Sequence, residues 1–413
     1  MRKFIPKKVL DLYHLLFAYG GAFLYRFPSK KLFVVGVTGT KGKSTTSELI
    51  RTVLAGAGHK VALASTIQFK IGTESEPNLF KMTMPGRAYL QKFLRKAVDA
   101  GCTHAVIEMT SEGAKQFRHK GIELDALVFT NLAPEHIESH GSLEAYAAAK
   151  LSLAKHLEES PKRPRYIVAN VDDAYGKQFL AAAVEVRAPF SLRDAEPYTA
   201  DDTSVRFMFK KGQLFSVPLP GLFSLKNILA AITLGDAIGV RHEIMRKTLE
   251  HIPPVAGRAE PVERGQDFSV IVDYAHTPDS LRALFETYTG KDLICVMGST
   301  GGGRDQWKRP LMGTIADELC SHIFLTNEDP YDENPTKIIV DIAGGFTTHI
   351  PEIILDRREA IAKALRRAKK GSVVAITGKG TDPYIMGAKG SKIVWSDKRA
   401  AEEELDKLLG AKS

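Results

Sequence analysis

The sequence has few cysteines, and their spacing excludes a cysteine-based metal site. Its 413 residues include three, Cys102, Cys295 and Cys320, which lie far apart and inside or beside apolar runs. Paired spacings of the kind that hold zinc are missing. We therefore expect three buried thiols in a cytoplasmic protein.

A run typical of a transmembrane helix or a cleaved signal peptide is also missing. Residues 9–25 are apolar and aromatic, but Asp11, His14 and the pair Gly20-Gly21 interrupt them, and no small-residue cleavage site follows. Residues 1–31 are instead expected to form a hydrophobic and basic segment that packs on the protein body, rests on a membrane surface or contacts a partner protein. Its flanking cations are Lys3, Lys7, Lys8, Arg26, Lys30 and Lys31.

The chain lacks the clustered basic residues of a nucleic-acid-binding protein. Its formal net charge is +9, but the 57 lysines and arginines are spread along the sequence. We therefore expect a small polyanionic substrate and no nucleic-acid partner. With 44% hydrophobic and 25% charged residues, a chain of this length is typical of a globular protein of two or three domains.

The strongest motif joins a predicted strand to a predicted helix. Residues 32–37 form an apolar, β-branched run, and residues 45–54 repeat apolar side chains at helical spacing. In such a turn backbone N–H groups converge at the positive end of the helix dipole, a lysine adds charge and a serine hydroxyl can ligate Mg²⁺. The turn predicts a nucleoside triphosphate site, although the strict motif requires glycine at Val37. Its residues are Gly39, Thr40, Lys41, Gly42, Lys43, Ser44 and Thr45.

Two α/β domains are predicted. Strands and helices alternate over residues 61–150, which indicates a mostly parallel sheet with helices on both faces. A stiff link at Pro253-Pro254 marks the boundary between domains. We expect a P-loop-type domain at 32–254 and a C-terminal, Rossmann-like, doubly wound domain at 255–413. The C-terminal strands are expected at 269–273, 293–298, 322–326 and 373–377.

Further candidate residues follow the next two predicted strands. Glu108 lies at the carboxyl end of a strand, where such sheets bind ligands, and is a candidate for Mg²⁺. The strand at 126–130 leads into a loop rich in polar side chains, and such loops carry function. A helix is expected to begin near Ser142, with Tyr146 and Lys150 on one face. The loop carries Glu135, His136, Glu138 and His140.

Several motifs occur together in the order found in the Mur ligase family. The chain resembles this family over residues 32–400, and within it the members that add the third amino acid of the cell-wall peptide. The motifs are Thr38-Gly-Thr-Lys-Gly-Lys-Ser-Thr-Thr, Glu108-Met-Thr-Ser, Thr130-Asn-Leu, Tyr146-Ala-Ala-Ala-Lys150, Asn170-Val-Asp-Asp, Gly257-Arg-Ala-Glu260, Asp273-Tyr-Ala-His276, Gly302-Gly-Arg-Asp305 and Gly378-Lys-Gly-Thr-Asp382.

The resemblance implies an ATP-dependent amide ligase. The γ-phosphoryl group of ATP activates an acceptor carboxylate as an acyl phosphate, and positive charge must neutralise the two approaching anions. It also implies two Mg²⁺ ions, one on Ser44 and Glu108 and a second on His136, with Lys150 carbamylated as an oxygen ligand. The implied catalytic residues are Lys43, Glu108, His136 and Lys150.

Substrate contacts are implied in the same way, with the C-terminal domain closing over ATP and holding a free amino acid. Nucleotide contacts beyond the loop are implied for Asn227, Arg258, Asp273, Tyr274 and His276. Contacts to a muropeptide-like acceptor are implied for Thr83, Ser111 and Arg118. Contacts to the amino acid are implied for Arg304, Asp329, Tyr331, Gly378 and Asp382.

The sequence departs from the family at two points. Members that add diaminopimelate have an arginine where Tyr331 stands, so we expect another amino acid, with Asp329 and Asp382 on a cationic amine. Three-domain members also have a uridine-diphosphate-binding domain ahead of the loop, where this sequence has residues 1–31. The alternatives are a ligase that extends another carboxylate, as folylpolyglutamate synthetase does, and a nucleotide-binding protein without turnover. We expect a monomer.

Overall fold

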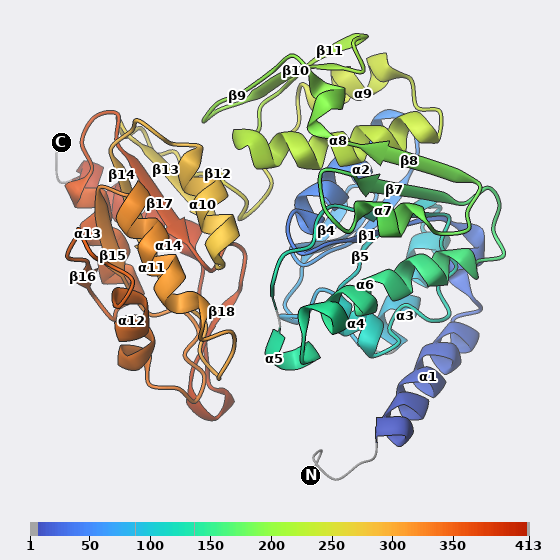
Figure 1. The fold of residues 1–413 in the computed structure, drawn as a ribbon, viewed down its shortest axis with the longest axis horizontal. Helices are drawn as coiled ribbons and strands as arrows, with labels where there is room; N and C mark the ends of the chain where they lie inside the picture. The colour runs from blue at the N-terminus through green and yellow to red at the C-terminus, as the bar shows by residue number, and fades with distance from the viewer. Residues whose placement is uncertain (1–6, 87, 136, 411–413) are drawn as a thin grey trace. The chain divides into compact units, whose positions relative to one another are not determined.

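The computed structural model describes residues 7–86, 88–135 and 137–410. The chain forms two compact units, drawn in Figure 1. Unit 1 comprises Met1–Thr199, Val205–Pro218 and Ser224–Ile252, and unit 2 comprises Ala200–Ser204, Leu219–Phe223 and Pro253–Ser413. The long segment of unit 2 thus begins at Pro253, and two short segments from the predicted central domain cluster with unit 2.

Unit 1 is built on an eight-stranded sheet of order β4-β3-β2-β5-β1-β6-β7-β8. Strands β2, β5, β1, β6, β7 and β8 run parallel, and β3 and β4 add an antiparallel edge. The prediction of a mostly parallel sheet is therefore confirmed. The strands are β1 (Phe33–Thr38), β2 (Val61–Ala64), β3 (Gln68–Ile71), β4 (Glu74–Pro77), β5 (His104–Glu108), β6 (Ala126–Phe129), β7 (Tyr166–Asn170) and β8 (Val186–Phe190).

Helices cover both faces of this sheet because successive buried strand residues point to opposite sides. Val34 and Ile107 belong to a core with α3 and α6, while α2 packs on the other face of β1, β2 and β5. Helix α6 begins as predicted, with Ser142 capping its first turn. The helices are α1 (Lys7–Leu24), η2 (Pro28–Lys31), α2 (Lys43–Gly56), α3 (Ala88–Asp99), α4 (Ser111–Lys115), α5 (Ile137–His140), α6 (Leu143–Glu158), α7 (Gly176–Leu180), α8 (Gly221–Ala237) and α9 (His242–Leu249).

A small sheet of order β11-β10-β9 follows, in which β10 and β11 pair antiparallel. Its strands are β9 (Tyr198–Ala200), β10 (Val205–Phe209) and β11 (Gln213–Val217), preceded by η3 (Leu192–Ala195). Helix α8 buries five large apolar side chains at helical spacing, namely Leu225, Ile228, Leu229, Ile232 and Leu234.

Unit 2 is a second doubly wound sheet, of order β12-β13-β17-β14-β15-β16. All strands but β12 run parallel. Helices α10, α11 and α12 pack on one face, and α13 and α14 on the other. The strands are β12 (Glu260–Pro261), β13 (Ser269–Asp273), β14 (Leu293–Met297), β15 (His322–Leu325), β16 (Glu352–Ile353), β17 (Val373–Thr377), β18 (Tyr384–Met386) and β19 (Lys392–Val394), and the helices α10 (Pro278–Glu286), α11 (Lys308–Leu319), α12 (Pro335–Ala343), α13 (Arg357–Arg367), η4 (Ala388–Gly390) and α14 (Asp397–Gly410).

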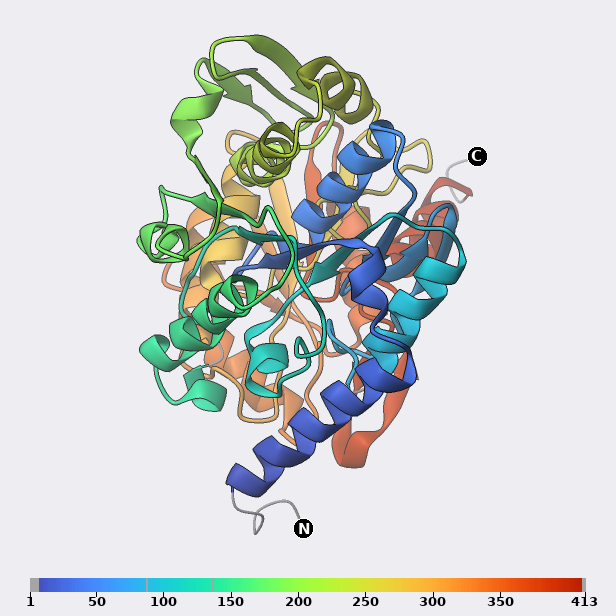
Figure 2. The same cartoon turned by 90° about the vertical axis from the view of Figure 1, so that its right-hand side faces the viewer.

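The three cysteines are free and buried, as predicted. Among the described helices, none combines the length and the apolar character needed to cross a membrane. Helix α1 leaves the body of unit 1 obliquely, as Figure 2 shows, and packs against α3.

Candidate active site

The glycine-rich turn after β1 has the backbone conformation that its glycines predict. Gly39 has a φ of 150° and Gly42 a φ of 79°, a region that L side chains rarely adopt. A Cβ atom on Gly39 would lie 1.9 Å from Thr130 Oγ1, and one on Gly42 would lie 2.1 Å from Asn227 Oδ1. Val37 is buried within β1, so the turn forms without the glycine of the strict motif.

The loop after β6 holds this turn in place. The backbone N–H of Thr40 donates to the Asn131 carbonyl at 2.8 Å, and that of Lys41 donates to Asn131 Oδ1 at 2.9 Å. Lys43 Nζ reaches back to the Thr40 carbonyl at 2.9 Å. The first N–H groups of α2 have no acceptor within the helix, and with the dipole they favour an anion at this point.

Ser44 and Glu108 lie in contact at the end of the turn. Ser44 Oγ donates to Glu108 Oε2 at 2.9 Å. Thr66 fixes the same carboxylate from the other side, donating to Oε2 from its backbone N–H at 2.8 Å and to Oε1 from its hydroxyl at 3.0 Å. Glu108 is buried and forms no ion pair within the described part of the chain. A buried carboxylate beside a hydroxyl, without a protein cation, fits a hard divalent ion such as Mg²⁺.

Lys150 lies against the turn, enclosed by protein. Its Nζ donates to the Gly39 carbonyl at 2.6 Å and lies 4.6 Å from the centre of the Tyr146 ring, so the predicted shared face is confirmed. Burial, and then the nearby charge of Lys43, hold the pKa of the Lys150 amine well below its ordinary value. A neutral amine has a free lone pair, which is what reaction with CO₂ requires.

The polar loop at 131–140, which already holds the turn through Asn131, also contributes an ion pair. Lys41 Nζ pairs with Glu135 Oε1 at 2.9 Å. His140 Nε2 lies 3.2 Å from Glu112 Oε1, and burial lowers the pKa of this histidine. His136 lies outside the described residues. Within the described ranges, no group of three or more His, Cys, Asp or Glu side chains could by itself hold a metal ion.

The three predicted acceptor residues lie around the Glu108 side of the turn. Thr83 Oγ1 lies 2.7 Å from Thr66 Oγ1, which links Thr83 to the carboxylate through one side chain. Ser111 begins α4, three residues after Glu108, and is buried. Arg118 donates to the Met84 carbonyl and to Gln116.

Thr66 contacts Glu108 but is not among the residues predicted from the sequence. The pattern that could have indicated it is the polar pair Ser65-Thr66 directly after the apolar strand β2, which neighbours β5 in the sheet. The same reasoning that identifies Glu108 at the end of β5 applies to this strand end.

In unit 2 the predicted nucleotide residues gather at the carboxyl end of β13. The Arg258 guanidinium lies 4.7 Å from the centre of the Tyr274 ring, and the Tyr274 and His276 rings are 4.6 Å apart. Asp273 is buried and accepts from the backbone N–H groups of Ala259 and Ala275, each at 2.6 Å. Burial raises the pKa of this carboxyl. These side chains therefore form one cluster of aromatic and charged groups.

The predicted amino-acid residues lie at the ends of β14, β15 and β17. Lys379 Nζ is fully buried and pairs with Asp329 at 2.8 Å and with Asp382 at 3.1 Å. A cation of the chain itself thus lies between the two carboxylates that were expected to hold a substrate amine. The Arg304 guanidinium lies 5.0 Å from the centre of the Tyr331 ring.

Glu328 is a second residue that the predicted site omits. It is 3% exposed, and its Oε1 accepts from Thr300 Oγ1 at 2.7 Å. Its Oε2 is buried and accepts no hydrogen bond from the described residues. A Cβ on Gly378 would lie 2.3 Å from this oxygen, so only glycine leaves it room. Glu328 therefore supplies a buried carboxylate oxygen that a cationic group of a ligand can satisfy.

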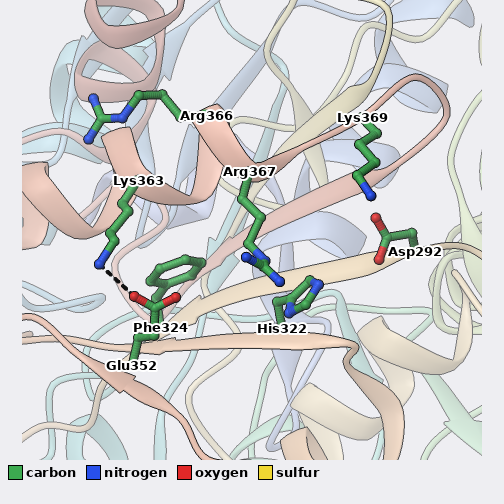
Figure 3. A pocket seen from close by; sticks show the side chains of 8 residues that line it. All are labelled: Asp292, His322, Phe324, Glu352, Lys363, Arg366, Arg367 and Lys369. Carbon is green, nitrogen blue, oxygen red and sulfur yellow. Dashed lines mark ion pairs between the residues drawn. The ribbon is translucent and has the colours of Figure 1, made fainter.

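A separate basic pocket of about 450 Å³ lies at the other end of the unit 2 strands from the predicted amino-acid residues (Figure 3). It lies at the amino ends of β14 and β15 and under the last turn of α13, where cations complement the helix dipole. Lys363 pairs there with Glu352 at 2.6 Å. Ligand sites of open α/β sheets lie at the carboxyl ends of the strands, so this pocket is no part of the candidate site.

Comparison with known proteins agrees with this geometry. The Mur ligase middle domain matches residues 37–235, and the Mur ligase, glutamate ligase domain matches residues 257–380. UDP-N-acetylmuramoyl-L-alanyl-D-glutamate–2,6-diaminopimelate ligase of Caldanaerobacter subterraneus subsp. tengcongensis is 35% identical over 394 residues, 92% of this chain and 79% of that protein. The ligase of the same name from Gloeobacter violaceus is 38% identical over 398 residues, 93% of this chain and 79% of that protein.

Solved structures give the same assignment. A UDP-N-acetylmuramoyl-L-alanyl-D-glutamate–2,6-diaminopimelate ligase, 28% identical, superposes with a TM-score of 0.63 over 95% of this chain and 83% of its own. Folylpolyglutamate synthase of Mycobacterium tuberculosis shares the fold at 14% identity, with a TM-score of 0.72 over 89% of this chain and 93% of its own. The chain belongs to the Mur ligase family, whose members are ATP-dependent ligases that form carbon–nitrogen bonds and release ADP.

Proposed function

We propose that this chain joins a free amino acid without a second side-chain carboxylate to a muropeptide-like acceptor, as a monomer in the cytoplasm. The observation that carries the ligase assignment is the contact between Ser44 and Glu108 at the glycine-rich turn. The contact brings a hydroxyl at the N-terminus of α2 beside a buried carboxylate, a donor set that supports a nucleotide-bound Mg²⁺. When bound, ATP and Mg²⁺ supply the phosphoryl group that activates the acceptor carboxylate.

We assign each of these contacts to residues of the chain. Ser44 and Glu108 hold one Mg²⁺, and His136 with carbamylated Lys150 holds a second. Lys43 neutralises charge on the transferred phosphoryl group. The remaining loop residues and Asn227 in unit 1, with Arg258, Asp273, Tyr274 and His276 in unit 2, bind the nucleotide. Thr83, Ser111 and Arg118 contact the acceptor.

A phosphate-release assay tests this function directly. The purified chain is supplied with ATP, Mg²⁺ and a panel of muropeptides, folates and other carboxylates, each with a panel of amino acids. We expect phosphate release that requires both a muropeptide and an amino acid, with formation of a new amide seen by mass spectrometry. Turnover only with folates and glutamate, or no turnover with any pair, would overturn the proposal.

Thr66 should position the Mg²⁺ ligand Glu108. Replacing Thr66 by valine removes the hydroxyl donor at 3.0 Å while the backbone donor remains. We expect the Mg²⁺ concentration for half-maximal activity to rise about tenfold, because partners of metal ligands typically contribute 10–100-fold to affinity. A Mg²⁺ titration at saturating substrates measures it. The matched control Thr52→Val, on the same unit, should leave the Mg²⁺ requirement unchanged, and an unshifted titration for Thr66→Val would contradict the role.

Diaminopimelate should not be the preferred amino acid of this chain. Tyr331 offers no charge to its second carboxylate, and burying an unpaired ionised group costs several kcal/mol. Asp329 and Asp382 already neutralise Lys379, so the amine of the amino acid is assigned to Glu328, whose Oε2 accepts no hydrogen bond from the residues that the structure describes. In competition assays we expect a diamino acid with one carboxylate, such as lysine, to outcompete diaminopimelate.

Two variants test separately the residue assigned to the amine of the amino acid and the residue that decides the use of diaminopimelate. Glu328→Gln keeps the size of the side chain and should raise the KM for the preferred amino acid while leaving the KM for ATP unchanged. Tyr331→Arg should increase the use of diaminopimelate. If diaminopimelate is the best substrate of the wild type, Arg304, the cation beside Tyr331, is the residue to replace next.

A further inference from the structure

Helix α1 is attached to unit 1 by a narrow face of small residues. Ala18 and Ala22 are 5% and 0% exposed. A Cβ on Gly21 would lie 3.1 Å from Ala88 Cα, and one on Gly121 would lie 2.8 Å from Ala22 Cβ. Residues 18, 21 and 22 therefore let the helix approach α3 and the 119–122 turn closely. This packing agrees with one expectation from the sequence, that residues 1–31 pack on the protein body.

The large apolar side chains of α1 point the other way. Phe23 is 77% exposed and Leu16 is 64% exposed, although Ala18 and Ala22 of the same helix are buried. Positions 9, 12, 16, 19 and 23 repeat at three- and four-residue intervals and so form one stripe along the helix. The exposed large side chains are Val9, Leu12, Tyr13, Leu16, Phe17, Tyr19, Phe23 and Leu24.

Charge is arranged around this stripe rather than within it. Between residues 9 and 24 the charged or titratable side chains other than tyrosine are Asp11 and His14, which are half-buried and fall on the side of Ala18 and Ala22. Three exposed cations follow the helix. They are Arg26, Lys30 and Lys31, of which Lys30 lies 3.8 Å from Glu123 and the other two form no ion pair with the residues described.

We infer that this outward stripe of α1 docks on an anionic lipid bilayer, lying in the interface. Apolar and aromatic side chains on one face and cations at the edge are the composition of a helix that rests on headgroups. One face of the helix packs on unit 1 through Ala18 and Ala22, and Asp11 and His14 interrupt its apolar sequence, so the helix lies on the bilayer instead of spanning it. Between residues 9 and 24 the exposed face carries no acidic side chain, and together with a net charge of +9 this favours a negatively charged surface.

Vesicle sedimentation of the full chain tests the docking. We expect binding to vesicles of phosphatidylglycerol and phosphatidylcholine, release at high salt, and at least tenfold weaker binding to phosphatidylcholine alone. Leu16→Glu/Phe23→Glu should abolish binding. The matched control, Ile350→Glu/Val394→Glu, changes two side chains of unit 2 that are 96% and 81% exposed, and it should bind like the wild type.

The cations form a separate arm of the test. Arg26→Gln/Lys30→Gln/Lys31→Gln should weaken binding to anionic vesicles about a hundredfold, since each basic residue near such a surface contributes about fivefold. Ligase activity without vesicles should be unchanged in the Leu16→Glu/Phe23→Glu variant and in the triple cation variant, which keeps the test independent of the proposed reaction. Absence of vesicle binding by the wild type overturns the inference. So does a dimer in light scattering that Leu16→Glu/Phe23→Glu dissociates, because a second copy of the chain would then cover the stripe.

Discussion

Replacing Lys43 by alanine is expected to abolish ligation while leaving the fold intact. Lys43 begins α2, its Nζ donates to the Thr40 carbonyl, and its half-buried side chain is not part of the hydrophobic core beside the sheet. Its charge is needed when phosphate and carboxylate approach each other. Removing one such electrostatic contact typically costs about 10²–10³ in kcat, and we expect a loss at the upper end of that range.

The measurement pairs steady-state phosphate release with thermal unfolding. Lys247→Ala provides the matched control, because Lys247 lies on the exposed side of α9 and pairs only with Glu243 one turn away. That control should keep full turnover, and both variants should unfold near the wild-type temperature. Ligation by Lys43→Ala at a rate close to the control would remove the turn from the mechanism.

The parallel strands of both units could be predicted closely because they are buried on both faces. β13 and β17 begin and end at the predicted residues, and β6 ends one residue before the predicted position, since continuous apolar runs bounded by polar residues mark such strands. The two-residue strands β12 and β16 escape this reasoning. They pair at the sheet edges, where the partner strand rather than the local sequence determines the conformation.

The residues of the candidate site could be predicted where they come directly after a strand. Contacts between side chains that are far apart in the sequence were harder to predict. Glu108 and the glycine-rich turn meet as expected because β1 and β5 are neighbours, with Val37 beside Glu108 in the register. The pairing of Lys379 with Asp329 joins residues 50 positions apart, and no local pattern indicates it. Such contacts depend on the strand order, which the sequence pattern alone does not determine.

Lys150 is expected to react with CO₂, and Lys379 is not, although both are fully buried. The Lys150 amine contacts a carbonyl and an aromatic ring, and burial lowers its pKa, so the neutral form is accessible. Its lone pair can bond to the carbon of CO₂, with one proton released to water, which gives a carbamate with two oxygen ligands. The Lys379 amine is instead held in ion pairs with two carboxylates, those of Asp329 and Asp382.

Labelling with ¹³C tests this expectation, with Lys379 as the control for Lys150. In ¹³C-bicarbonate the wild type should show a carbamate resonance that disappears in Lys150→Ala and persists in Lys379→Arg. Lys150→Ala should lose about 10²–10³ in kcat, the typical effect of removing one charge-stabilising group from a site, and short carboxylates such as formate or acetate should restore part of it by supplying the missing oxygen ligands. Full activity of the wild type after exhaustive removal of bicarbonate, with no carbamate signal, would show that the unmodified lysine suffices and would contradict this role.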